Sequence, residues 1–277
     1  MNNSAISNKY DTLKRVIQKW PALAVAFSGG VDSSLLLAAA VDSLGDRVVA
    51  LTAVSALHPA REIRTAVDIA SRLGVRHVLI RTDEMRQPAF RANTPERCYL
   101  CKKMIFERLI ATAAAMGTHQ LAHGVNMDDF EDFRPGLRAA AEMAIRAPLV
   151  DARLSKAEVR RLARERGLPN WNRPAKACLA SRVPYDTPLS HSLLAQVEAA
   201  ENLLEDMAFE GGRVRCHGPL ARIELATEAD MVRVISPECR QRLVQGMKNI
   251  GFTYVALDME GYRQGSMNDA LVSRRDT

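Results

Sequence analysis

The stretch Ser28-Gly-Gly-Val-Asp-Ser33 lies where an apolar run ends and a helical pattern begins, and it decides the fold. The preceding residues, 23–27, are short and apolar enough for a buried strand, and leucine and alanine recur after the stretch with the period of a helix. Gly29 and Gly30 lack a Cβ atom, so the backbone can turn sharply and bring N–H groups against phosphate oxygens at a helix N-terminus. The stretch therefore predicts a phosphate-binding loop, with an ordinary glycine turn as the alternative.

The spacing of this loop differs from two common nucleotide motifs. No Gly-Lys-Ser/Thr follows, as a Walker A loop requires, and the Gly-x-Gly-x-x-Gly spacing of a dinucleotide fold is absent. Ser28 and Ser33 can offer hydroxyl donors to a phosphate. Asp32 is expected to hold the loop or a Mg²⁺ ion, because its carboxylate would repel a phosphate group directly.

Length and composition are those of a globular protein. The chain has 277 residues, 47% of them hydrophobic and 25% charged, which leaves room for one large domain and a small one. No stretch approaches the roughly 18 apolar residues of a membrane span, and the N-terminus lacks the apolar core of a signal peptide, so we expect a cytoplasmic protein without membrane contact. The net charge of +6 suits anionic partners, either nucleotides or nucleic acid.

Strand and helix patterns alternate after the loop. Residues 48–54 and 78–80 have the pattern of buried strands, and residues 62–73 between them have a helical pattern. This alternation predicts an α/β fold with a doubly wound parallel sheet. In such sheets ligands bind at the carboxyl ends of the strands, which is where residues 28–33 are expected.

A fourth apolar run, residues 121–125, is followed by polar and acidic residues that include Asn126 and Asp129. Carboxylates after a parallel strand can contact a nucleotide or its metal ion. Acidic residues at the start of a solvated helix are the alternative, since they suit the helix dipole equally well. Further on, Ser155-Lys-Ala-Glu158 has the pattern of a capping box and predicts a helix that ends near Gly167.

The five cysteines form an odd set, which argues against a disulfide framework. Cys98 and Cys101 form a C-x-x-C just before a helical run over 102–116, so both thiols can point at one centre. The pair is compatible with a redox couple, part of a zinc site, two ligands of an iron–sulfur cluster, or two ordinary thiols. Cys178 lies in the irregular segment 171–186 among basic residues whose positive charge favours a thiolate, with a buried inert cysteine as the alternative.

The sequence pattern changes beyond residue 190. A helical run is followed by two strand-like runs, a second helical run and a third strand-like run, which is the order of a small α+β domain. We therefore expect two domains, 1–184 and 185–277.

Arginines and carboxylates of this second domain are candidate ligands. Arg213 and Arg215 alternate along one strand, so both face the same side, and together with Arg182 they can clamp the phosphate of a substrate. A solvated strand face is the alternative. Glu224 and Asp230 can bind a metal ion or pair with these arginines, and the sequence leaves both open.

Taken together, these motifs resemble those of the LarE family, ATP-dependent sulfur transferases of the PP-loop ATP pyrophosphatase superfamily, whose sheet is of the adenine nucleotide α-hydrolase type. The matching segments span nearly the whole chain and are 28–33, 97–102, 126–136, 178–182, 213–215, 221–224 and 261–266. The first is shared across the superfamily, while the cysteine and C-terminal segments are more discriminating.

The resemblance implies an activity. The enzyme would adenylate a carboxylate of pyridinium-3,5-biscarboxylic acid mononucleotide with ATP and Mg²⁺ and replace it with a thiocarboxylate, in the biosynthesis of the nickel-pincer nucleotide cofactor. The second domain would bind the substrate or join subunits. The residues that the resemblance assigns to ATP binding are Ser28, Gly29, Gly30, Asp32, Ser33, Asn126 and Asp129.

The cysteines decide which branch of the family the chain resembles. Some members carry only the cysteine that matches Cys178 and give up its sulfur, leaving dehydroalanine, whereas members with three cysteines are thought to hold an iron–sulfur cluster. This chain has all three, so the resemblance implies a 4Fe–4S cluster held by Cys98, Cys101 and Cys178. Three thiolates leave one iron open to carry a sulfide for transfer.

The resemblance also implies partners. It predicts a homo-oligomer such as a hexamer, a small nucleotide substrate and no nucleic acid. Two other functions stay open. A tRNA thiolation enzyme shares the loop and often the cysteine pair, but the chain displays no recognisable RNA-binding module. A non-catalytic iron–sulfur carrier with a regulatory ATP site is the second.

Overall fold

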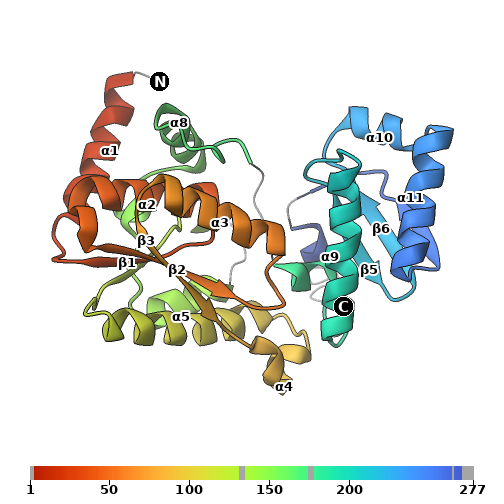
Figure 1. The fold of residues 1–277 in the computed structure, drawn as a ribbon, viewed down its shortest axis with the longest axis horizontal. Helices are drawn as coiled ribbons and strands as arrows, with labels where there is room; N and C mark the ends of the chain where they lie inside the picture. The colour runs from red at the N-terminus through yellow and green to blue at the C-terminus, as the bar shows by residue number, and fades with distance from the viewer. Residues whose placement is uncertain (1–2, 131–134, 174–177, 264, 270–277) are drawn as a thin grey trace. The chain divides into compact units, whose positions relative to one another are not determined.

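The computed structural model describes residues 3–130, 135–173, 178–263 and 265–269 (Figure 1). Contacts divide the chain into two units: the first contains Met1–Glu84 and Glu96–Lys176, and the second contains Met85–Pro95 and Ala177–Thr277. The contact boundary therefore falls at residue 177, and no sequence pattern indicated that 85–95 joins the second unit. As a division into independently folding domains, 1–184 and 185–277 stays a prediction.

Among the described residues, the first unit is built on a parallel sheet of four strands. They are β1 (Leu23–Ala26), β2 (Val48–Val54), β3 (Arg76–Arg81) and β4 (Leu121–His123), in the spatial order β3-β2-β1-β4. Because all the pairs are parallel, the carboxyl ends of the strands share one edge. The predicted α/β class with a parallel sheet is confirmed.

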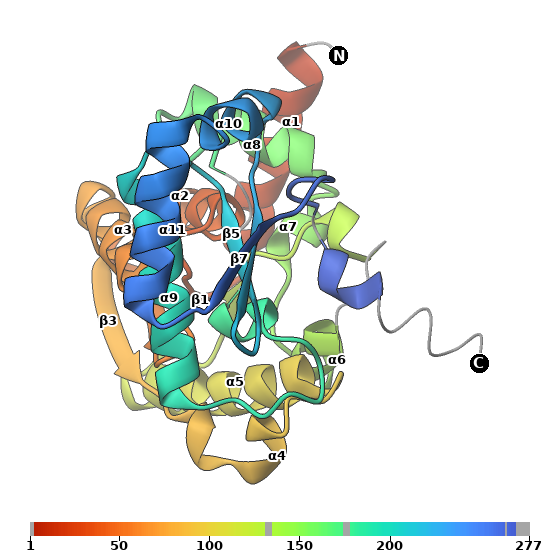
Figure 2. The same cartoon turned by 90° about the vertical axis from the view of Figure 1, so that its right-hand side faces the viewer.

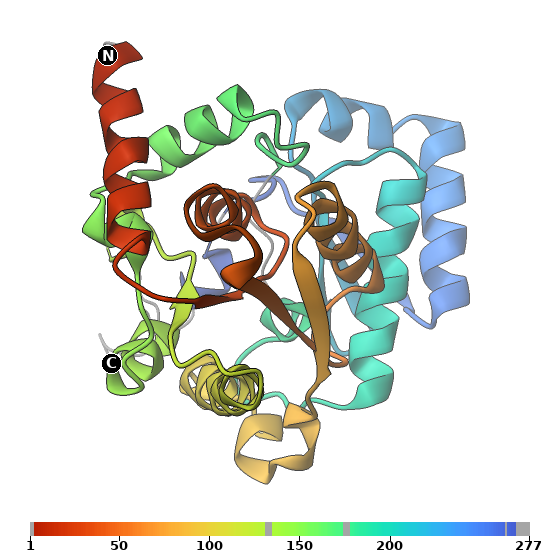
Figure 3. The ribbon, with the colours of Figure 1, turned by 60° about the vertical axis from the view of Figure 1, so that its left-hand side comes forward.

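Helices cover both faces of this sheet. Those of the first unit are α1 (Asn3–Ile17), α2 (Val31–Leu44), α3 (Ala60–Arg72), α5 (Arg97–Ala115), α6 (Pro135–Glu142), α7 (Pro148–Asp151) and α8 (Lys156–Glu165). Leu23 and Val25 of β1 belong to an apolar cluster with α1, α2, α3 and α8, whereas Ala24 belongs to a second cluster with α5 and α6. The strands accordingly lie between α2 and α5. Figure 3 shows these two helices nearly end-on, in red and yellow-green. β1 is apolar throughout because both of its faces are covered.

Two helix starts matter for the site. α8 opens with the predicted capping box: Ser155 Oγ accepts a hydrogen bond from the Glu158 N–H over 3.3 Å, and the Glu158 carboxylate accepts one from the Ser155 N–H over 2.9 Å. α5 begins at Arg97, so the predicted start at residue 102 is wrong and the C-x-x-C lies in the first turn of the helix. Cys98 and Cys101 are three residues apart on a helix, so they share one face.

The second unit has a smaller, mixed sheet. In its described residues the strands are β5 (Arg213–His217), β6 (Leu220–Glu224) and β7 (Tyr254–Leu257), with β5 antiparallel and β7 parallel to β6. Its helices are α4 (Pro88–Arg91), α9 (His191–Asp206), α10 (Glu228–Val234) and α11 (Pro237–Ile250). α9 and α11 pack side by side (Figure 2), and the expected second sheet is confirmed. In the described ranges of both units, every helix is too short or too polar to cross a membrane.

Candidate functional site

Residues 28–33 follow β1 and are closed by hydrogen bonds within the loop. The Ser33 hydroxyl donates to the Gly30 carbonyl over 3.0 Å and accepts from the Ser28 hydroxyl, which itself accepts from the Gly30 N–H over 3.3 Å. Gly29 has φ +71°, a conformation that favours glycine. The serine hydroxyls therefore shape the loop, and no side chain caps the described N-terminus of α2. Its N–H groups are available to an anion.

Asp32 lies in the first turn of α2, and both of its carboxylate oxygens are engaged. One accepts a hydrogen bond from the Asn126 side chain over 2.9 Å, and the other forms an ion pair with Lys156. Asn126 is buried, and its backbone N–H donates to the Asp129 carboxylate over 3.0 Å. The structure thus brings Asp32 together with Asn126 and Asp129, while residues 131–134 of the expected acidic segment lie outside the described residues.

Lys156 is a site residue that the sequence patterns did not single out. It is the first residue of α8, and its backbone N–H donates to the Asp128 carboxylate over 3.1 Å, which fixes the start of α8 beside Asp32. A lysine in the first turn of a helix opposes the helix dipole. That local conflict, inside a clear capping box, is the signal that could have found it.

Asn170 is a second residue that the sequence patterns missed. Its buried side-chain amide donates to the Gly29 carbonyl over 2.8 Å and to the Ser34 hydroxyl over 2.9 Å. It therefore braces residues 28–33, the predicted phosphate loop (called the phosphate loop below), from the segment after α8. Nothing in the neighbouring sequence, which follows a finished helix and a proline, marks this role.

The end of β4 packs directly against the loop. A Cβ atom on Gly124 would lie 2.6 Å from the Ser33 nitrogen, so the two backbones approach as closely as glycine allows. The preceding residue, His123, packs edge-on against Phe106 of α5, with ring centres 5.8 Å apart. Burial, and after it the positive charge of Lys102, lowers the pKa of His123 to about 4. The His123 ring is therefore neutral at neutral pH.

Cys98 and Cys101 are partly exposed, form no disulfide and lie in the first turn of α5. Tyr99, between them, donates to the Glu142 carboxylate over 2.7 Å. The guanidinium carbon of Arg138 lies 4.0 Å from the centre of the Tyr99 ring. Glu142 and Arg138 both belong to α6, so these contacts fasten the thiol-bearing turn to that helix.

Cys178 is a partly exposed thiol before the short 3-10 helix η4 (Leu179–Arg182) of the second unit. Its carbonyl accepts from the Ser181 N–H over 3.0 Å and from the Ser181 hydroxyl over 2.8 Å. Arg182 is 1% exposed and donates to the two carboxylate oxygens of Glu201 over 2.7 and 3.0 Å. Its third nitrogen donates to the Ser181 hydroxyl over 2.8 Å. Arg182 thus ties the Cys178 turn to Glu201 of α9, and its role as a phosphate clamp stays a prediction.

Arg213 and Arg215 of β5 are 6% and 5% exposed, so the alternative of a solvated strand face is wrong. Arg215 forms an ion pair with Glu224 over 2.6 Å. It also donates to the Ser181 carbonyl over 3.2 Å and to the Ser266 hydroxyl over 3.3 Å. The segments of the second unit that support the family resemblance therefore meet at Arg215.

The carboxylates considered as weak metal ligands are both held by arginine. Glu224 also pairs with Arg222 over 3.1 Å, and Asp230 pairs with Arg233 over 3.0 Å. In the part of the chain that the structure describes, no group of three His, Cys, Asp or Glu side chains is arranged to hold a metal ion. The three expected cluster ligands are divided between the units, since Cys178 belongs to the second unit and the C-x-x-C to the first. Lys176, one of the cations expected near Cys178, lies outside the described residues.

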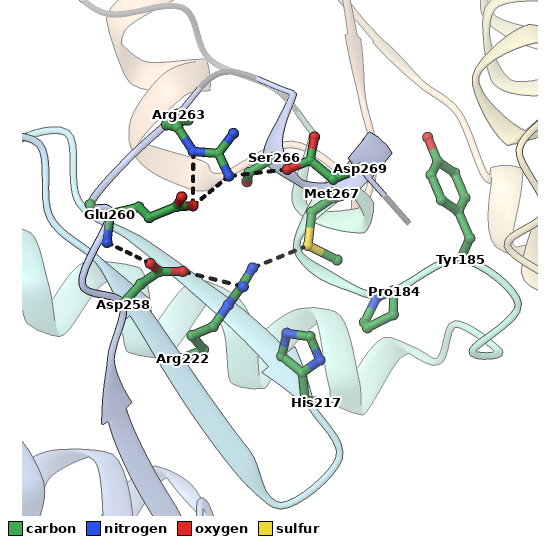
Figure 4. A pocket seen from close by; sticks show the side chains of 11 residues that line it. Pro184, Tyr185, His217, Arg222, Asp258, Glu260, Arg263, Ser266, Met267 and Asp269 are labelled. Carbon is green, nitrogen blue, oxygen red and sulfur yellow. Dashed lines mark hydrogen bonds and ion pairs between the residues drawn. The ribbon is translucent and has the colours of Figure 1, made fainter. Parts of the chain in front are cut away.

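A cavity of about 400 Å³ opens in the second unit (Figure 4). It is lined by Pro184, Tyr185, His217, Arg222, Asp258, Glu260, Gly261, Arg263, Ser266, Met267 and Asp269. Ion pairs form its walls, with Arg222 on Asp258 over 3.2 Å and Arg263 on Glu260 over 2.6 Å. Burial, followed by the charge of Arg222, lowers the pKa of His217. The cavity adjoins Ser266, which also contacts Arg215.

Comparisons with known proteins show the family to which the chain belongs. A family model described as queuosine biosynthesis protein QueC matches residues 22–107, which include the phosphate loop. The chain is 38% identical over 277 residues to the pyridinium-3,5-bisthiocarboxylic acid mononucleotide synthase of Lactiplantibacillus plantarum, covering 97% of this chain and 96% of the synthase. It is 39% identical over 266 residues to an uncharacterized protein of Synechocystis sp., covering 96% of this chain and 99% of that protein.

A more distant relative matches only part of the chain. An argininosuccinate synthase of Methanocaldococcus jannaschii is 30% identical over 159 residues, which are 52% of this chain and 40% of that enzyme. The match to the mononucleotide synthase, in contrast, extends through both units. With its phosphate loop, parallel sheet and nearly full-length relatives, the chain belongs to the LarE family of the PP-loop ATP pyrophosphatase superfamily.

Proposed function

We propose that this protein is an ATP-dependent sulfur transferase that converts a carboxylate of pyridinium-3,5-biscarboxylic acid mononucleotide into a thiocarboxylate. The observation that carries the proposal is the match, over nearly the whole chain, to a synthase named for the bisthiocarboxylic acid product. The position of residues 28–33 at the carboxyl edge of the parallel sheet supports it, because such edges bind nucleotide phosphates.

In the first step, a carboxylate oxygen of the substrate attacks the α-phosphorus of ATP. The bond to the bridging oxygen breaks, and pyrophosphate leaves with the bonding electrons. The uncapped N–H groups of α2 would bind the phosphates of ATP. The Lys156 side chain would leave its ion pair with Asp32 and offset the negative charge of these phosphates. A Mg²⁺ ion on the phosphates would add Lewis-acid stabilisation, with Asp32 as its protein ligand.

In the second step, a sulfur nucleophile attacks the adenylated carboxyl carbon, and AMP leaves with the electrons of the carbon–oxygen bond. Adenylation is needed because the oxygen of a free carboxylate is a poor leaving group. Cys98, Cys101 and Cys178 are proposed to hold a 4Fe–4S cluster, which would supply this sulfur from its open iron position. In support, none of the three forms a disulfide, and all three side chains are neither fully buried nor fully exposed.

Arg213 and Arg215 are proposed to bind the phosphate of the substrate, and the second unit to carry the contacts of a homo-oligomer. In support, the Nε of Arg215 is buried and has no hydrogen-bond partner within the described residues. A guanidinium that is already fixed by Glu224 loses little freedom when it binds a phosphate.

The activity is tested by incubating the purified protein, without oxygen, with ATP, Mg²⁺ and pyridinium-3,5-biscarboxylic acid mononucleotide. We expect pyrophosphate release that depends on the substrate and a product in which sulfur has replaced one carboxylate oxygen. An equal rate of ATP hydrolysis with and without the biscarboxylic mononucleotide would contradict the proposal. Transfer of sulfur to bulk tRNA would replace it with the thiolation alternative.

The iron and sulfide content of the protein distinguishes a cluster-bound sulfide from the sulfur of Cys178 as the sulfur source. After anaerobic reconstitution we expect about four iron atoms per chain in the wild type and little iron in Cys98→Ala or Cys101→Ala. Cys239→Ala is the matched control, since Cys239 is also a partly exposed free thiol. If the wild type binds no iron and Cys178 becomes dehydroalanine after one turnover, Cys178 is itself the donor.

A further inference from the structure

Lys102 is an exposed cation of the first unit that the steps above do not use. It follows Cys101 on α5, and among the described residues its ammonium pairs with no carboxylate. Its side chain lies along Phe106, with 5.6 Å between the ammonium and the ring centre. The ammonium is therefore open to an anionic ligand.

The stem of Lys102 is held by α6. A Cβ atom on Gly136 would lie 2.8 Å from Lys102 Cγ and 3.6 Å from the Cys98 carbonyl oxygen, so the backbone of α6 lies directly against the stem of this lysine. A surface lysine normally loses much side-chain freedom when it binds a ligand. A stem that is already held loses less, which favours binding.

The sheet shows where the ammonium lies. The ammonium lies 5.6 Å from the centre of the Phe106 ring, and that ring packs edge-on against His123, which ends β4 and pairs with Ala26 of β1. After burial, the charge of Lys102 also lowers the pKa of His123. β1 lies between β2 and β4 and leads into residues 28–33. The ammonium is therefore placed at the carboxyl edge of the sheet, on the α5 face, near the end of the strand that leads into the phosphate loop.

We propose that Lys102 binds the carboxylate of the substrate that is adenylated, an inference that rests on the proposed function. The carboxylate and the α-phosphate are both anions, so a cation beside them lowers the repulsion as they approach. The carbon of the same carboxylate then receives sulfur, and Lys102 adjoins the thiol pair on one helix. Lys156 already lies at the loop with Asp32, so the two lysines serve different anions.

A binding measurement tests this without requiring turnover. The probe is pyridine-3,5-dicarboxylate, titrated by calorimetry into the full chain saturated with an ATP analogue that cannot release pyrophosphate. We expect Lys102→Met to bind the probe about ten- to a hundredfold more weakly than the wild type, which is the loss of one charged hydrogen bond. Lys102→Arg should recover part of this loss.

Lys103→Met is the matched control. Lys103 is the next residue on α5 and is also exposed, but its ammonium lies 5.9 Å from the centre of the Tyr99 ring. We expect this variant to bind the probe like the wild type, and all variants to bind the ATP analogue with an affinity within about twofold of it.

Three results would overturn the inference: equal probe binding by Lys102→Met and the wild type, no probe binding by the wild type, or a Lys102→Met variant that loses the ATP analogue instead. Failure of the proposed function has a different signature. In that case pyrophosphate release does not depend on the biscarboxylic mononucleotide, whatever the probe titration shows.

Discussion

Asn170 donates from its side-chain amide to the backbone carbonyl of Gly29 over 2.8 Å, and the same amide donates to the hydroxyl of Ser34 over 2.9 Å. Asn170, in the segment after α8, therefore bonds both to the phosphate loop and to α2, the helix that follows the loop. Because Asn170 is 1% exposed, solvent does not compete for these hydrogen bonds. The shape of the loop depends on a segment far along the chain.

Asn170→Ala should accordingly weaken both stability and nucleotide binding. The truncation leaves a buried carbonyl and a buried hydroxyl without a donor, so we expect the free energy of unfolding to fall by about 1–3 kcal/mol and the affinity for an ATP analogue to fall with it. Urea unfolding and calorimetric titration measure the two effects. Asn172→Ala, at an exposed position two residues on, should change neither. Unchanged ATP affinity in a destabilised Asn170→Ala would restrict this residue to packing.

Lys156→Met should weaken ATP binding with little change in stability. Removing a cation from the first turn of α8 relieves a conflict with the helix dipole, while the lost ion pair with Asp32 is partly solvated. We expect these effects to cancel to within about 1 kcal/mol, whereas affinity for the Mg²⁺ complex of an ATP analogue drops about tenfold or more. Arg161→Met, on the same helix, controls for general charge, because Arg161 pairs with Glu165 of that helix. Wild-type affinity in Lys156→Met would remove this lysine from the phosphate site.

The loop and the strands around it could be predicted because their signals are local. The strand over Val48–Val54 has the predicted bounds, since a continuous apolar run between polar residues needs no distant partner to be recognised. The capping box of Ser155 and Glu158 is present for the same reason. The predicted start of α5 is wrong because the apolar period begins only after its first turn. Contacts of Tyr99 and Glu96 with α6 stabilise that turn.

The rest of the site could not be predicted because it depends on contacts between distant segments. Strand alternation indicated that Arg213 and Arg215 share a face, but only Glu224, Ser181 and Ser266 make that face a buried polar cluster around Arg215. Lys156 and Asn170 likewise acquire a role only when α8 and the segment after it fold back onto the loop. Local periodicity in the sequence predicts helices and strands, but it does not indicate which residues of distant segments pair with each other.

Breaking the buried pair of Arg215 and Glu224 should strongly destabilise the second unit. Glu224→Gln leaves the Arg215 charge buried without a full counter-charge, and we expect the free energy of unfolding to fall by about 3–5 kcal/mol. Glu260→Gln is the matched control, because the pair of Arg263 and Glu260 is 48% and 68% exposed and should contribute less than about 1 kcal/mol. Chemical unfolding of both variants measures the difference. Equal small losses would contradict a structural role for Glu224, and a wild-type melting temperature that falls with a chelator would favour metal binding there.

The pKa of His123 predicts how stability depends on pH. Burial, and then the charge of Lys102, lowers it from its ordinary value of 6.5 to about 4. The unfolded chain therefore binds a proton that the folded chain does not, between these two values. The resulting stability is fully present above about pH 6.5 and is lost as the pH falls toward 4, up to about 3 kcal/mol. His58 and His77, whose pKa values are lowered mainly by burial, act in the same direction.

Urea unfolding at about pH 7 and about pH 5 measures how the free energy of unfolding depends on pH. The measured change contains the contributions of all groups that titrate in this range. We expect His123→Gln to lose less stability than the wild type between the two pH values, because it no longer has a ring to protonate on unfolding. His119→Gln replaces an exposed histidine and should keep the wild-type slope. We expect proton NMR titration of the His123 ring to give a pKa near 4, as an independent check. If His123→Gln and the wild type have the same slope, the ring titrates normally, which contradicts its packing against Phe106.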